Sequence, residues 1–324
     1  MLNKGKLKNW VVDLVINSYI QAKELLMNFF QIAVFIAGLL LVLTITQCKK
    51  MTTSGPPTET DVRFLAHKGG GDNSFNTQYV ENTLSAVHEG LKTLNGVEVD
   101  LQMSRDGTIW MFHNMDIGQS SCNTTYHHSI VLLNDAEIEK NQICNGNVQD
   151  RIYKLEELIN LWNNTASGFV ISLHIKIDFP ADTINNPLIG GEAAYLSKFS
   201  ANLAKLFPTL KHQDQLFVEI YDATFCTKIH TTIPGIKVFL IKSVTFPTLI
   251  DDALAAGYDG VSCYLFESTL TVEEVKRARD NGLVVQLWTP DNRDDLLKAF
   301  NLKPNFIQTN NLKAISLLNL KVVI

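Results

Sequence analysis

The chain has 324 residues, of which 46% are hydrophobic and 19% are charged, and its formal net charge is −5. A chain of this size can bury one large core or two ordinary ones, and its many apolar residues argue against disorder. No run rich in Lys and Arg is present. A nucleic-acid partner is therefore disfavoured, because binding a phosphate backbone requires a positive surface.

The N-terminal segment is strongly apolar: residues 25–47 carry no charge and precede Cys48 and two lysines. A stretch of this length can span a bilayer as an uncleaved anchor. The run "TITQC" also resembles the lipobox of bacterial lipoproteins, in which the cysteine is lipidated, although Gln47 departs from the usual small residue. Either reading predicts an extracytoplasmic, membrane-anchored protein. The predicted organisation is a hydrophobic signal or anchor segment at 1–48, a flexible tether at 49–60 and one folded domain at 61–324.

The other four cysteines fit a compartment that permits disulfides. Cys122 and Cys144 flank a polar insertion at 114–150 and could staple it. Cys226 and Cys263 lie in or beside apolar strands, and two alternatives stay open for them, free buried thiols or a second disulfide.

From residue 62 onward, short β-rich runs alternate with helical stretches. Strand–helix alternation predicts a parallel sheet, and eight units in roughly 270 residues fit a closed (β/α)8 barrel, for which about 250 residues is typical. A doubly wound open sheet is the alternative, but no Gly-x-Gly-x-x-Gly follows the first strand. The predicted strands are 62–67, 97–102, 169–177, 215–221, 236–241, 259–265, 283–288 and 305–309.

One segment breaks the alternation, "VEVDLQMSRDGTIWMFHN" at 97–114. The linker "SRDG" is too short for a helix, so the segment is predicted to form a β-hairpin excursion after the second strand. With the turn centred on the "RD" pair, Glu98 would lie opposite His113, and Asp100 would share the face of Glu98. A one-residue slip would send His113 to the other face, and a bulge at Gly107 could cause or correct such a slip.

Glu98 and Asp100 carry the first signal for chemistry. Two carboxylates on one inward face of a barrel strand repel each other and lose hydration, so they stay ionised only around a positive group. A solvated outer face is the alternative, but the apolar residues of the strand already occupy the helix-facing side. Mg²⁺ and Ca²⁺ prefer oxygen ligands, so these acids predict one divalent metal ion.

A second group is "LAHKGGG", in which His67 and Lys68 end the first predicted strand. Active sites of (β/α)8 barrels are built at the C-terminal ends of the strands. The three glycines that follow would let backbone approach a ligand closely. Further along, Glu81-Asn82-Thr83 is predicted to start the first helix, because Asn82 or Thr83 can cap it.

The runs "FLAHKGGG", "VENTLSAV", "GVEVDLQMSRDGTIWMFHN" and "QLWTPDN" together resemble the motifs of the glycerophosphodiester phosphodiesterase family, a (β/α)8 group of phospholipase-C-like phosphodiesterases. The resemblance implies hydrolysis of glycerophosphodiesters to glycerol 3-phosphate and an alcohol, with one divalent ion and two histidines. It implies that His67 and His113 are the acid–base pair, that Glu98 and Asp100 bind the metal, and that Trp288 lines the substrate pocket. Two imidazoles that titrate near neutrality can divide such work.

The chain departs from the family's pattern in several places. Lys68 stands for the usual arginine and loses its bidentate fork for phosphate. Asn114 and Asn310 stand where the family commonly has aspartates. A Glu-x-Lys pair, which supplies a third metal ligand and a phosphate contact, is replaced by His174 and Lys176.

The third metal ligand is therefore open between His174 and Glu219, which lies on the neighbouring predicted strand. His174 would favour Mn²⁺ or Zn²⁺, whereas Glu219 would keep an all-oxygen site for Mg²⁺ or Ca²⁺. His174 could also be a hydrogen-bonded core histidine. By its place on the face of His174, Lys176 is predicted to contact the phosphate, as Lys68 is at the first strand.

Two other functions stay open. A related phospholipase acting on intact lipid headgroups would need an apolar rim around the barrel mouth, whereas the polar insertion at 114–150 suggests a small soluble phosphodiester. A non-catalytic barrel that binds phosphoryl ligands would explain the departures. Retention of both histidines and both acids argues against that reading.

Overall fold

The computed structural model describes residues 61–122, 127–164, 168–177 and 179–320. The predicted signal or anchor segment and the tether lie outside the described residues. Within the described part of the chain, no helix is both long enough and apolar enough to cross a membrane.

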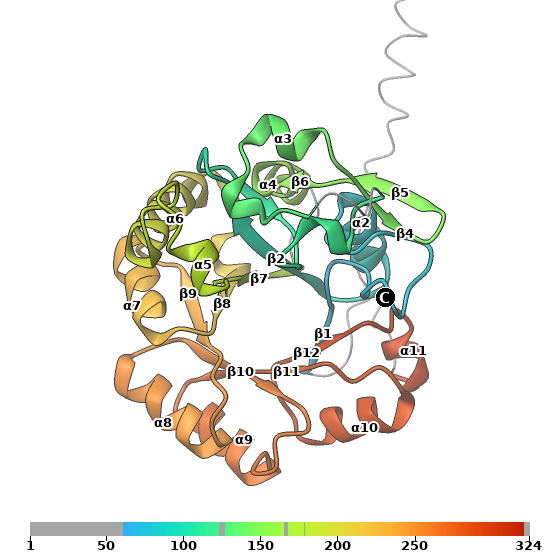
Figure 1. Cartoon of the computed structure of the whole chain (residues 1–324). Helices are drawn as coiled ribbons and strands as arrows, with labels where there is room; N and C mark the ends of the chain where they lie inside the picture. Colours follow the sequence, from blue (N-terminus) through green and yellow to red (C-terminus); the bar gives the residue numbers. More distant parts are fainter. Residues whose placement is uncertain (1–60, 123–126, 165–167, 178, 321–324) are drawn as a thin grey trace, which may run out of the picture. The chain divides into compact units, whose positions relative to one another are not determined.

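Among the described residues, eight parallel strands close into a barrel, which Figure 1 shows from one end. The strand β1 pairs with β12 on one side and with β2 on the other, so the sheet has no free parallel edge. The predicted (β/α)8 barrel is confirmed, and the open sheet is wrong. The barrel strands are β1 (Arg63–Ala66), β2 (Gly96–Met103), β7 (Val170–Ile175), β8 (Leu216–Ile220), β9 (Lys237–Leu240), β10 (Gly260–Tyr264), β11 (Val284–Trp288) and β12 (Phe306–Thr309).

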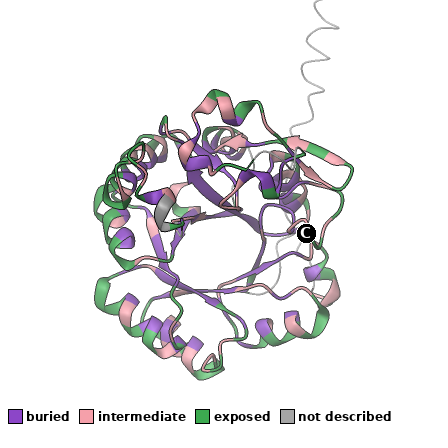
Figure 2. Ribbon diagram, in the orientation of Figure 1, coloured by how far each residue is buried: buried purple, intermediate pink, exposed green. Residues whose placement is uncertain are grey.

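Helices cover the outside of the barrel, with their buried faces toward the strands and their exposed faces toward solvent (Figure 2). Polar caps fix several helix starts: Thr83 accepts a hydrogen bond from the Ala86 N–H at the start of α2, as predicted. The helices are α2 (Leu84–Thr93), α4 (Leu155–Asn163), α5 (Ala181–Ile184), α6 (Glu192–Leu206), α7 (Ala223–Thr232), α8 (Phe246–Ala256), α9 (Val272–Asp280), α10 (Arg293–Asn301) and α11 (Ala314–Leu317), with 3-10 turns η3 (Phe207–Thr209) and η4 (Gln213–Gln215).

The predicted hairpin after the second strand forms between β2 and β3 (Ile109–Met111), but its predicted register is wrong. The Ser104 N–H donates to the Thr108 carbonyl, and Gly107, with φ of 100°, closes a three-residue loop. Such loops place a left-handed residue and a bulge at the turn, and the pairing shifts by one residue. Glu98 is therefore not paired with His113, because the β3 ladder ends at Met111.

The polar insertion forms a small cap beside this hairpin (Figure 1). A disulfide joins Cys122 to Cys144, which confirms the predicted staple. Cys226 and Cys263 are buried free thiols. The described elements of the cap are η1 (Ile117–Gln119), η2 (Ile130–Leu132), α3 (Asp135–Glu139), β4 (Gln142–Asn145) and β5 (Val148–Arg151). The short strand β6 (Tyr153–Lys154) follows the cap and pairs with β3.

The barrel interior changes character along its axis. Near the N-terminal ends of the strands, the ring of Phe217 stacks on Phe239 with centroids 3.9 Å apart and lies 5.2 Å from the ring of Phe306. Above this apolar layer, the buried carboxylate of Glu219 sits in a polar layer. The C-terminal ends of the strands are thereby left for the most polar groups, as in other barrels of this fold.

Candidate active site

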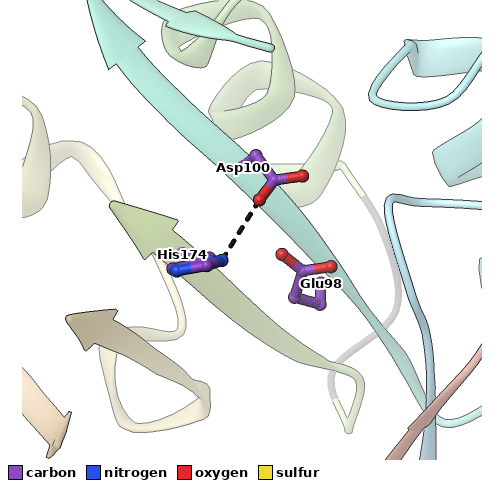
Figure 3. A group of neighbouring side chains, drawn as sticks. All are labelled: Glu98, Asp100 and His174. Atoms are coloured by element: carbon purple, nitrogen blue, oxygen red, sulfur yellow. Dashed lines mark ion pairs between the residues drawn. The ribbon is translucent and has the colours of Figure 1, made fainter. Parts of the chain in front are cut away.

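Glu98 and Asp100 of β2 converge with His174 of β7 at one point of the barrel interior (Figure 3). One ligand atom from each of the three side chains lies within 4.8 Å of the other two. Asp100 and His174 are register partners on adjacent strands, and the distance from His174 Nδ1 to Asp100 Oδ1 is 3.1 Å. Strand alternation places both acids on the inward face, as the sequence predicted.

Glu98 shows why this cluster suits a cation. Its Oε2 accepts a hydrogen bond of 2.8 Å from the Lys68 backbone N–H. Its Oε1 is buried and has no hydrogen-bond partner among the described residues. Burial, and then the negative charges of Asp100 and Glu219, raise the pKa of Glu98 well above its usual range. A buried, unpaired carboxylate oxygen beside a second acid and an imidazole is a donor set that fits a divalent ion.

Asp100 is held in place by Asn82, a contact that sequence reasoning missed. Asn82 Nδ2 donates to Asp100 Oδ2 at 3.0 Å, and Asn82 Oδ1 accepts from the Asp100 N–H at 2.8 Å. Burial alone would raise the pKa of Asp100, but His113, His174 and Lys176 together hold it well below its usual range. Asp100 is therefore an ionised anchor for the cluster.

Lys68 lies beside the cluster but directs its ammonium elsewhere. Lys68 Nζ is 3.2 Å from each carboxylate oxygen of Glu81. The Lys68 side chain is only 10% exposed, and its backbone has a φ of 50°. The first two residues of Glu81-Asn82-Thr83 thus stabilise the site, while the third caps a helix as predicted.

His67 follows β1 and is oriented by the C-terminal end of β12. His67 Nδ1 is 2.8 Å from Asn310 Oδ1. Asn310 Nδ2 donates to Asp291 Oδ2 at 2.8 Å, so the carboxamide oxygen is the end that faces the imidazole. His67 Nδ1 must therefore carry the proton, which leaves Nε2 with a free lone pair. Burial, and then Lys68, lower the pKa of His67.

The glycines after Lys68 serve this arrangement. A side chain at Gly71 would place Cβ 2.6 Å from the Asn310 carbonyl oxygen, and φ there is +93°. Gly69 likewise approaches Val87 of α2. The sequence predicted that these glycines let the backbone approach a ligand. In the structure they let the loop pack closely against α2 and Asn310, and this packing holds His67 in place.

His113 reaches the site by a route that register alone did not predict. After Met111 the chain leaves the β3 ladder and crosses the inward face of β2. There, Gln102 Nε2 donates to the carbonyls of residues 112, 113 and 114 at 3.0, 3.2 and 2.8 Å. His113 Nδ1 is 3.0 Å from Asn114 Oδ1, and Asn114 Nδ2 donates to Ser120 Oγ. Both histidines therefore face the oxygen of an asparagine whose amide nitrogen is engaged elsewhere.

The two candidates for a third ligand differ clearly in their surroundings. His174 joins the two acids, whereas Glu219 lies outside the cluster formed by the described residues. Both oxygens of Glu219 accept hydrogen bonds, Oε1 from Ser172 Oγ and Gln308 Nε2 and Oε2 from Ser262 Oγ at 2.7 Å. Glu219 is already satisfied by neutral donors, so it is the weaker candidate.

Lys176 and Trp288 lie on opposite sides of the barrel mouth. Lys176 follows β7, and its charge contributes to the low pKa of Asp100. Trp288 ends β11, and its indole packs near Tyr264 with ring centroids 5.2 Å apart. A pocket lined by Trp288, Tyr221 and Tyr264 opens there.

Residues on the inward faces of β2 and β7, and residues just after β1 and β3, define a (β/α)8-barrel enzyme whose site combines two imidazoles with the Glu98-Asp100-His174 cluster. The chain belongs to the glycerophosphoryl diester phosphodiesterase family, whose model matches residues 67–314. It is therefore a phosphodiesterase. The family resemblance seen in the sequence is confirmed.

Solved structures agree with this fold. A protein from Silicibacter pomeroyi assigned as a glycerophosphoryl diester phosphodiesterase superposes with a TM-score of 0.66 at 17% identity, covering 82% of this chain and 95% of that chain. An Oleispira antarctica phosphodiesterase, in complex with the product sn-glycerol-3-phosphate, gives a TM-score of 0.61 at 18% identity, covering 79% and 96%. A glycerophosphodiester phosphodiesterase from Parabacteroides distasonis gives 0.62 at 14% identity, covering 80% and 96%. No curated protein sequence matches the chain significantly.

Proposed function

We propose that this chain is a divalent-metal-dependent hydrolase that converts glycerophosphodiesters to glycerol 3-phosphate and an alcohol. The single observation that carries the proposal is the unpaired, buried Glu98 Oε1 beside Asp100 and His174. His67 Nε2 lies 3.8 Å from Glu98 Oε2, and His113 is near enough to act on the pKa of Asp100. The family membership and the glycerol 3-phosphate bound to the Oleispira relative support the substrate class.

In this proposal Glu98, Asp100 and His174 hold the ion. When bound, the ion supplies positive charge that offsets the negative charge growing on the phosphate in the transition state. Lys176 adds a cation on the same side, and we assign it to the phosphate oxygens. Lys68 is assigned a supporting role through Glu81, because its ammonium is already paired there.

His67 and His113 divide the proton transfers. One imidazole takes a proton from the attacking water or hydroxyl as the new P–O bond forms. The other gives a proton to the alkoxide that leaves as the old P–O bond breaks. In each ring the Nδ1–H faces an asparagine oxygen, so Nε2 is the atom available to the reactants.

We infer that His174 is the third ligand and that the site accepts Mn²⁺ or Zn²⁺ more readily than an all-oxygen site would. The variant His174→Glu should shift the metal preference of turnover toward Mg²⁺ or Ca²⁺, because oxygen ligands suit hard ions. Glu219→Gln should have a mild effect, since its partners are neutral. Loss of metal dependence in Glu219→Gln would instead identify Glu219 as the ligand.

The proposed activity is tested on the purified full chain. Glycerol 3-phosphate and free alcohol are measured after incubation with glycerophosphocholine, glycerophosphoethanolamine and glycerophosphoglycerol. We expect release that stops with EDTA and returns with an added divalent ion. If none of these diesters is hydrolysed with Mg²⁺, Ca²⁺, Mn²⁺ or Zn²⁺, the proposed activity is wrong. The result would then favour the alternative, a non-catalytic barrel that binds phosphoryl ligands.

Hydrolysis of intact lipid headgroups is a second candidate function, and one observation favours it. Tyr221, Tyr264 and Phe266 are exposed by 42%, 47% and 45%, which places apolar surface at the C-terminal end of the barrel. The same assay with phosphatidylcholine vesicles separates this activity from hydrolysis of the small diesters.

We also propose that the chain is held to a membrane outside the cytoplasm through its N-terminal segment. The support comes from the sequence alone, the uncharged residues 25–47 followed by Cys48. Mass spectrometry of the N-terminal peptide tests it: a lipid on Cys48 that is lost in Cys48→Ser indicates a lipoprotein, and an intact residue 1–48 segment in the membrane fraction indicates an uncleaved anchor. Recovery of unmodified full chain in the soluble fraction contradicts both.

A further inference from the structure

We propose that the pocket at the C-terminal ends of β8, β10 and β11 is a subsite for a quaternary ammonium group on the leaving alcohol, so that the preferred substrates are choline-type phosphodiesters. This inference rests on the proposed function and names the substrate class of the same site. The pocket has a volume of about 650 Å³ and is lined by Tyr221, Tyr264 and Trp288, together with Glu267 and Lys242.

The pocket opens directly beside the candidate metal cluster. Tyr221 follows β8, and its ring centroid is 6.5 Å from that of His174. In a choline ester the ammonium nitrogen is four bonds from phosphorus, about 5 Å in an extended chain. A phosphate held beside His174 therefore places the ammonium within reach of the Tyr221 ring.

The aromatic walls present π faces from different directions. The rings of Tyr264 and Trp288 are 5.2 Å apart and inclined at 43°, so they form a corner rather than a flat stack. A cation within about 6 Å of a ring centroid is attracted by the negative face, and quaternary ammonium groups are bound in aromatic cages of this kind. The neighbouring Phe266 ring already faces Lys298 Nζ at 4.7 Å, so it is not counted among the walls.

The charges around the pocket also favour a cationic occupant. Lys242 Nζ is 2.6 Å from Asp252 Oδ2, so its charge is paired. Glu267 adds a carboxylate to the lining, held by Thr269 and the Phe246 N–H. An anionic headgroup would meet this carboxylate and the π faces without a free cation among the described lining residues.

The experiment compares glycerophosphocholine with its neutral isostere, the 3,3-dimethylbutyl ester of glycerol 3-phosphate, on the full chain. We expect kcat/KM for the choline ester to be about tenfold higher, mainly through KM, since the two differ only in charge. Tyr264→Leu and Trp288→Leu should bring this ratio close to one. The matched control Tyr264→Phe keeps the ring and should keep the preference.

Inhibition supplies a second measurement that uses only the unchanged chain, so it holds even if the variants do not fold. Free choline should inhibit hydrolysis of glycerophosphoglycerol by the unchanged chain at roughly tenfold lower concentration than 3,3-dimethylbutanol. Equal hydrolysis of the two esters and equal inhibition overturn the subsite while leaving the proposed function intact. Failure to hydrolyse any diester overturns the proposed function itself. Lysophosphatidylcholine hydrolysed with the same sensitivity to Tyr264→Leu supports the subsite with a lipid as the source of the headgroup.

Discussion

The two sides of the barrel mouth are built from different kinds of residue. The side formed by β1, β2 and β7 gathers acids and imidazoles, and asparagines fix their orientation. The side formed by β8, β10 and β11 presents three aromatic rings around a pocket. The first side is organised by hydrogen bonds that tolerate little displacement, and the second by apolar faces that accept different shapes. We therefore expect residues of the first side to determine the rate of the chemical step and residues of the second side to determine which alcohol is preferred.

The largest expected effect comes from the histidines. His67→Ala and His113→Ala should each lower kcat by about 10²–10⁴-fold, because each removes one proton transfer. Circular dichroism should show an unchanged fold, since both side chains lie at the mouth. Steady-state kinetics on glycerophosphocholine measure the effect. Near-full activity in His113→Ala would mean that the crossing segment does not bring His113 to the reactants.

The next effect concerns Asn82, which holds Asp100 by two hydrogen bonds. Asn82→Ala should weaken metal affinity or activity by roughly 10–100-fold, as loss of a ligand's hydrogen-bond partner does in other metal sites. Metal titration followed by activity measures it. Asn160→Ala, on the exposed face of α4, is the matched control and should change neither quantity. If both variants lose the same metal affinity and activity, Asn82 has no specific role in holding Asp100.

A smaller effect should appear in the pH profile of Asn310→Asp. Burial, and then Lys68, lower the pKa of His67 in the unchanged chain, where its partner Asn310 is neutral. The carboxyl at residue 310 replaces an amide that donates to Asp291 at 2.8 Å, so the two carboxyls repel and their negative charge is pushed toward the His67 imidazole. This charge favours the imidazolium, and the pKa of His67 should therefore rise. The limb of the kcat/KM profile that reports His67 should move to higher pH. Asn311→Asp adds the same charge one residue away and should leave that limb in place.

The smallest expected effect is the number of protons that the protein releases when it binds the metal ion. Because the pKa of Glu98 is raised, its carboxyl holds a proton in the metal-free protein at a pH where a free glutamate is ionised. Metal binding should expel up to about one proton per ion, and metal affinity should fall as the pH falls. Calorimetric titrations in buffers of different ionisation enthalpy measure the release. Glu98→Gln should abolish it, and an unchanged release would place the proton on another group.

Much of the fold followed from local pattern. Alternating strand and helix runs predicted the closed barrel, and the spacing of Glu98 and Asp100 predicted their shared inward face. The hairpin was also predicted, but its register was not, because one bulge residue at Gly107 shifts the pairing and no periodicity reveals it. His113 still reaches the site, since Gln102 binds the backbone beyond the ladder. The spacing of Gln102 from Asp100, two residues along the same face, was the available signal.

Local patterns in the sequence were enough to predict the barrel and the two inward acids, because strand alternation and strand–helix periodicity are local properties. The two histidines were identified through the family resemblance, since the predicted hairpin register was wrong. The tertiary structure decided which distant residues complete the site. Asn310 and Asp291 orient His67 from the other end of the chain, and His174 rather than Glu219 meets the two acids. These choices depend on how strands far apart in sequence close around one axis, and the side-chain contacts made there have no signature along a single strand.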